Sequence, residues 1–89
     1  MSLITTSQRN DLRTALLSEL TAARTVALPA EALTRRVIRS KVLDFEPSAE
    51  DANKEIDALF RRGLITSIPD PVTGVLHYQA TAAGVAACP

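Results

Sequence analysis

The sequence holds one cysteine, one histidine and three glycines among its 89 residues, and each shortage excludes a kind of site. Because Cys88, next to the last residue, is the one thiol in the sequence, neither an internal disulfide nor a cysteine-based zinc site can form. The glycines Gly63, Gly74 and Gly84 are scattered and make no phosphate-binding loop. Because His77 is the sole imidazole, no nucleophile can be matched with a base and an orienting group. We therefore expect no enzyme, no cofactor and no metal site.

Long apolar runs are also missing, and we do not expect the first residues to be a leader. Residues 1–6 have no basic segment and no extended apolar stretch, so they do not look like a signal peptide. No apolar stretch elsewhere approaches the length that crosses a bilayer. We expect a cytoplasmic protein that does not enter the membrane. With 46% hydrophobic and 22% charged residues, the chain is typical of one globular domain, 1–89.

Ten basic and ten acidic residues give zero net charge, but the two signs are segregated along the chain. Residues 25–42 hold one acid and four cations, namely Arg35, Arg36, Arg39 and Lys41. These cations either bind phosphates or form a solvated face that pairs with acids of the next helix. Residues 43–57 hold six acids against one cation. We interpret the acids as helix capping and solubility, with docking of a basic partner, such as a second copy, as the alternative.

The first predicted helix runs from about Ser7 to Arg24. Its apolar residues recur at spacings of three and four and form one stripe, made of Leu12, Ala15, Leu16, Leu20 and Ala23. Thr5 and Gln8 have the spacing of a capping box at its start. Leu17 falls off the stripe, so we expect it to be partly exposed, or else to make a small dimer contact.

A short β-prone segment, 25–28, precedes a second predicted helix from about Pro29 to Ser40. The helical spacing turns Leu33 and Val37 inward and the three arginines outward. In the turn that follows, we expect three residues to anchor in the core: Val42, Leu43 and Phe45.

The third predicted helix, Ser48 to Arg62, has the clearest limits. Ser48 is a good cap, acids follow it at the positive end of the helix dipole, and Gly63 is a natural stop. Its predicted core face consists of Ala52, Ile56, Leu59 and Phe60. Segments 64–68 and 75–79 then have a strand-like pattern and flank a turn at 69–74, as in a hairpin. A short helix is predicted over 81–87.

This order of elements, together with the motifs LFRRGLI (59–65), DPVTG (70–74) and YQATAAG (78–84), resembles bacterial winged helix-turn-helix transcription regulators. The resemblance implies an α+β, mainly α fold: a three-helix bundle with a β-hairpin wing and a short C-terminal helix. It also implies that the third helix enters the major groove of DNA while the wing touches the flanking backbone or the minor groove.

The leading hypothesis is therefore a regulatory module that binds double-stranded DNA with modest affinity. Its predicted DNA-binding residues are Arg35, Arg36, Arg39, Lys41, Asn53, Lys54 and Arg61. The outward face of the third helix, however, mixes these cations with acids at spacings of three and four, and the wing contains no Lys or Arg. The alternative is a winged-helix module for protein–protein interaction, acting as an adaptor or a homodimer.

Overall fold

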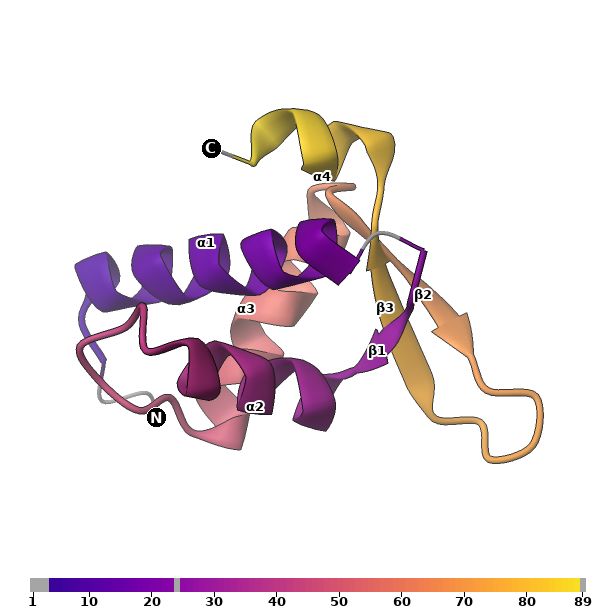
Figure 1. Cartoon of the computed structure of the whole chain (residues 1–89), viewed down its shortest axis with the longest axis horizontal. Coiled ribbons are helices and arrows are strands. Elements are labelled where there is room, and N and C mark those ends of the chain that lie inside the picture. Colours follow the sequence, from indigo (N-terminus) through magenta and orange to yellow (C-terminus); the bar gives the residue numbers. More distant parts are fainter. Residues whose placement is uncertain (1–3, 24, 89) are drawn as a thin grey trace.

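The computed structural model describes residues 4–23 and 25–88. Within these ranges the chain forms four helices and a three-stranded antiparallel sheet (Figure 1). The order is α1 (Thr6–Ala23), β1 (Leu28–Pro29), α2 (Ala30–Ser40), α3 (Ala49–Arg61), β2 (Ile65–Pro69), β3 (Leu76–Ala80) and α4 (Ala82–Ala87). The predicted α+β, mainly helical class is confirmed. Arg24, the expected last residue of the first helix, lies outside the described residues.

Local side-chain caps set the starts of three helices. At α1 the amide of Gln8 donates to Thr5 Oγ1 at 3.1 Å, and the amide of Thr5 donates to Gln8 Oε1 at 3.0 Å. At α3 the amide of Asp51 donates to Ser48 Oγ at 3.0 Å, and Asp51 accepts from the amide of Ser48 in return. At α4 the amide of Gly84 donates to Thr81 Oγ1 at 3.1 Å. Both predicted caps, at Thr5 and Ser48, are confirmed.

The core lies where α1, α2 and α3 meet the sheet. Its largest fully buried side chains come from these three helices and from β2: Leu12, Leu16, Leu20, Leu33, Val37, Leu59 and Ile65. Burying one such aliphatic side chain stabilises the fold by about 1.5–3 kcal/mol. Apart from Phe60 on the third helix, the apolar stripes predicted for the three helices are the faces that pack together.

Two expectations about apolar residues outside the helical stripes are wrong. Leu17 is buried, because α4 returns over α1 and Leu17 lies beside Gly84. Val42 is 67% exposed and does not anchor the turn after α2. Leu43 and Phe45 pack against the core as expected. Lys41 ends α2 in a left-handed conformation, with φ of 58°, and the chain reverses there so that Val42 points to solvent.

The sheet has the order β1-β3-β2. Register pairs Ile65 with Ala80, Ser67 with Tyr78 and Pro69 with Leu76, so these side chains share one face. Since Ile65 belongs to the core, this is the face that meets the helices. β2 and β3 continue past the helices as a projecting hairpin (Figure 1).

Candidate functional site

The outer face of α3 is the surface that sequence reasoning singled out. Its buried side consists of Asp51, Ala52, Glu55, Ile56 and Leu59. Phe60 was expected on this core face, but its side chain is 46% exposed. Because a helix has 3.6 residues per turn, Phe60 lies on the same side of α3 as Asn53 and Asp57, and this side faces the hairpin. That expectation is corrected: Phe60 is a surface aromatic.

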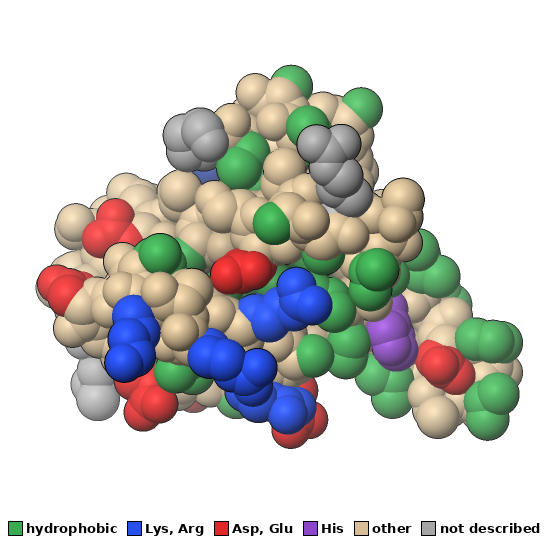
Figure 2. All heavy atoms as spheres, in the orientation of Figure 1, with side chains coloured by type: hydrophobic (Ala, Val, Ile, Leu, Met, Phe, Trp, Pro, Cys, Tyr) green, Lys and Arg blue, Asp and Glu red, His purple; other side chains and the backbone are tan. Residues whose placement is uncertain are grey.

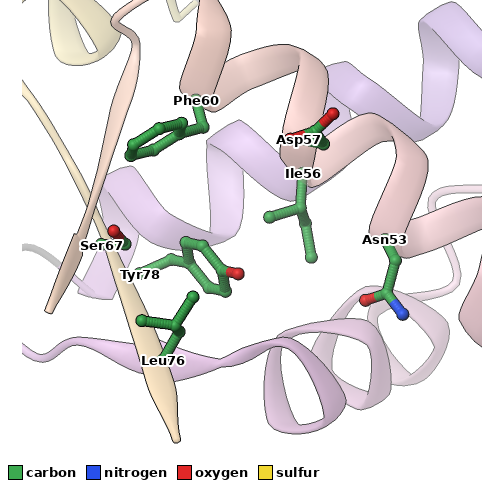
Figure 3. Close-up of a pocket in the computed structure, with 7 residues that line it drawn as sticks. All are labelled: Asn53, Ile56, Asp57, Phe60, Ser67, Leu76 and Tyr78. Atoms are coloured by element: carbon green, nitrogen blue, oxygen red, sulfur yellow. The ribbon is translucent and has the colours of Figure 1, made fainter. Parts of the chain in front are cut away.

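Between α3 and the hairpin lies an open groove of about 340 Å³. α3 contributes Asn53, Ile56, Asp57 and Phe60, and the hairpin contributes Ser67, Leu76 and Tyr78. In Figure 3 the rings of Phe60 and Tyr78 and the side chain of Leu76 surround the same space, with Asn53 at one end. Leu76 is 45% exposed, so the groove shows substantial apolar surface to solvent.

The charges on the outer face of α3 are paired within the helix. Lys54 Nζ lies 3.6 Å from Glu50 Oε1, and Arg61 pairs with Asp57. Both pairs join residues four positions apart and are solvent-exposed, so each contributes only about 0.3–0.5 kcal/mol. The pairing expected from the spacing is confirmed, and the surface around the groove is close to neutral.

The cations of α2 lie on a different surface. Arg35 pairs with Glu31 at 3.5 Å and lines a hollow between α2 and α3 that also contains Asn53. Arg36 and Arg39 line a separate hollow with Glu19 of α1. Among the described residues, no acid forms a salt bridge with either of them or with Lys41. Figure 2 shows Lys and Arg side chains gathered over α2.

The seven predicted DNA-binding residues are therefore divided between two surfaces. Four belong to α2 and the residue after it: Arg35, Arg36, Arg39 and Lys41. Three belong to the outer face of α3: Asn53, Lys54 and Arg61. Arg35 and Asn53 are brought together by the hollow between the two helices, whereas Arg36 and Arg39 lie on the side of α2 next to α1.

The hairpin tip, residues 70–74, is a turn held by its own polar groups. Asp70 Oδ1 accepts from the amides of Val72 and Thr73 at 2.8 and 2.9 Å, and these amide hydrogen bonds lower the pKa of Asp70. The amide of Gly74 donates to the Asp70 carbonyl at 2.9 Å. Val72 lies in this turn and is 90% exposed to solvent. The tip is thus an ordered apolar projection.

Sequence reasoning missed one buried polar link. Glu55 is buried on α3, and its Oε1 accepts hydrogen bonds from Nε and Nη2 of Arg13 on α1 at 3.0 and 2.8 Å. Glu55 follows Ala52 by three positions and precedes Leu59 by four, so helical spacing alone places it on the core side. Rather than providing solubility, this acid joins α1 to α3.

Within residues 4–23 and 25–88, no three His, Cys, Asp or Glu side chains are grouped so that they could hold a metal ion. No helix in the same ranges combines the length and apolarity needed to span a membrane. No protein-family model matches the chain, and no curated protein or solved structure is significantly similar to it. What the surface does is therefore inferred from its own side chains.

Proposed function

We propose that the chain is a winged helix-turn-helix module that binds another protein through the groove between α3 and the hairpin. The fold assignment is supported by the element order and by the sheet order β1-β3-β2, in which a short strand after α1 pairs beside the hairpin. In that fold α3 is the recognition helix and the hairpin is the wing.

One observation carries the functional proposal: the space between the recognition helix and the wing is mainly apolar. Phosphates require Lys, Arg or amide donors around them, and base edges reward the same groups. Here the facing side chains include Phe60, Leu76 and Tyr78, and the carboxylate of Asp57 lies among them. A phosphate backbone in this groove would meet no Lys or Arg among the lining residues, because Arg61 at its edge is already paired with Asp57, and it would desolvate apolar surface.

The same groove suits a protein segment. Aromatic residues are enriched at the centres of protein interfaces, where apolar area removed from water contributes about 25 cal/mol per Å². Phe60 and Tyr78 are two such rings on opposite walls, and Asn53 offers hydrogen bonds at one end. An apolar side chain entering between the walls would cover Phe60 and Leu76, which are both about half-exposed in the free chain.

A peptide-display selection tests this proposal. Peptides enriched on the wild-type chain should bind about tenfold or more weakly to Phe60→Ser and to Leu76→Ser, because each variant removes one apolar wall. Val85→Ser is the matched control, since Val85 is also half-exposed but lies on α4. If no peptide is enriched, or if enriched peptides bind both groove variants as tightly as wild type, the groove is not an interaction site.

A second candidate, binding of duplex DNA, is favoured by a different observation. Arg36, Arg39 and Lys41 are exposed, lie on or directly after one helix, and form no salt bridge among the described residues. Such groups release counterions when they approach phosphates, which gives salt-sensitive and sequence-independent affinity. With three such cations the binding would be modest, and it would use α2 rather than the groove.

A further inference from the structure

The occupant of the groove can be named from the chain's own surface, an inference that rests on the proposed interaction function. We propose that the groove binds the hairpin tip of a second copy. In the resulting two-fold dimer, each chain inserts the tip around Val72 into its partner's groove.

The tip has the properties that such an insertion needs. It projects beyond the helices (Figure 1), and Val72 at its end is 90% exposed. The hydrogen bonds from the Val72 and Thr73 amides to Asp70 Oδ1 hold the turn in one shape before any partner arrives. Little conformational entropy is therefore lost when the tip is enclosed, which favours binding.

The projecting hairpin tip and the groove belong to one continuous surface. Leu76 lines the groove and belongs to the strand that leads directly from the tip. A two-fold interface requires one patch to carry both complementary shapes, and this patch carries an apolar projection beside an apolar groove. Pairing along the outer edge of β2 is a weaker route to a dimer, because Pro69 in that edge strand has no N–H to donate.

The charges of the two parts are also complementary. Residues 64–81 include no Lys or Arg, and Asp70 is their single acid. The groove edge carries the guanidinium of Arg61, beside Asp57, and the amide of Asn53. Because Asp57 is paired with Arg61, an entering tip brings one carboxylate to a nearly neutral edge that offers hydrogen-bond donors, and it brings no cation toward Arg61. A tip containing Lys or Arg would not have this match.

Sedimentation of the purified full chain tests the inference, with circular dichroism as the check of folding. Wild type is expected to form a dimer as its concentration rises to about 1 mM. Val72→Asp and Phe60→Ser should each weaken dimerisation about tenfold or more. Leu76→Ser serves as a second groove variant if Phe60→Ser does not fold. Val42→Asp is the control, since it adds the same charge at an exposed valine that follows α2 and is not part of the hairpin.

Mixing two defective variants gives the decisive result. A Phe60→Ser chain keeps an intact tip and a Val72→Asp chain keeps an intact groove, so their mixture should regain one of the two contacts and form heterodimers. A mixture that stays monomeric, or a wild-type chain that is monomeric throughout, overturns the inference. If that monomeric wild type still binds selected peptides through Phe60, the proposed function stands while the second-copy occupant is wrong. If peptide binding is also absent, both are wrong.

Discussion

Arg13 on α1 donates two hydrogen bonds to a single oxygen of Glu55 on α3, at 3.0 Å from Nε and 2.8 Å from Nη2. The Glu55 side chain is 6% exposed and that of Arg13 is 22% exposed, so water does little to compensate either charge. The pair ties the helix that carries the proposed recognition surface to the longest helix of the core. A buried pair of this kind is costly to form, and losing one partner is costlier still.

Removing one partner of this pair should therefore destabilise the fold strongly. Arg13→Met leaves the Glu55 carboxylate buried without a cation, and we expect the free energy of unfolding to fall by about 3 kcal/mol. Urea denaturation followed by circular dichroism measures the change. The double variant Arg13→Met with Glu55→Leu should recover most of the loss, because it buries no charge. A double variant as unstable as the single one would show that packing around Arg13, not the charge, matters.

Gly84 is expected to be the least replaceable glycine of the chain. A Cβ at this position would lie 2.0 Å from the carbonyl oxygen of Leu64, a backbone atom that cannot move aside freely. Gly84→Ala should therefore lower the unfolding free energy by about 2 kcal/mol, although alanine favours helices by about 1 kcal/mol.

Gly74→Ala is the matched control for Gly84. Its added Cβ meets nothing within 4 Å, and its positive φ of 75° costs only about 1 kcal/mol. Thermal unfolding of the two variants gives the comparison. If Gly84→Ala is the more stable of the two, helix propensity outweighs the contact with Leu64 and the close docking of α4 is not needed.

The features predicted correctly from the sequence are local ones. Ser48 and Thr5 specify their helix starts through hydrogen bonds to residues three positions on, so no distant element is needed to recognise them. The salt bridge between Lys54 and Glu50 follows from their spacing in the same way. Element order, and with it the α+β class, rests on such signals.

The features that were missed depend on contacts distant in sequence. Leu17 is buried because α4 passes over it, and Phe60 is exposed because the hairpin leaves a groove beside α3. The local pattern of apolar residues predicts neither arrangement. The predicted DNA-binding residues were chosen by type, and the sequence did not indicate that Arg36 and Arg39 lie on the α1 side of α2.

The hairpin tip should respond to acid through Asp70. Hydrogen bonds from the Thr73 and Val72 amides hold the pKa of Asp70 below its ordinary value of 3.8, so the folded state prefers the carboxylate. The stabilisation is present above pH 3.8 and is lost as the pH falls through the lower pKa of the folded state. Asp70→Asn keeps an acceptor oxygen but does not titrate.

Unfolding free energies of wild type and Asp70→Asn, measured from neutral pH to below 3.8, give the comparison. The advantage of wild type should be constant above pH 3.8 and should shrink as the pH falls below that value. An advantage that is constant with pH would mean that the turn does not depend on the charge of Asp70.

Duplex binding should depend on α2 rather than on α3. Each phosphate contact contributes about 0.9 to the slope of log affinity against log salt, so replacing Arg36, Arg39 and Lys41 together by Ala should flatten the slope by about 2 to 3. Lys54→Ala with Arg61→Ala is the matched control, because those cations are already paired with Glu50 and Asp57. Fluorescence polarisation with a mixed-sequence duplex at low salt and at about 0.2 M salt measures both variants. If the control loses binding while the α2 variant keeps it, α3 contacts DNA directly, and the apolar groove beside it is then part of a DNA-binding surface rather than a site for protein.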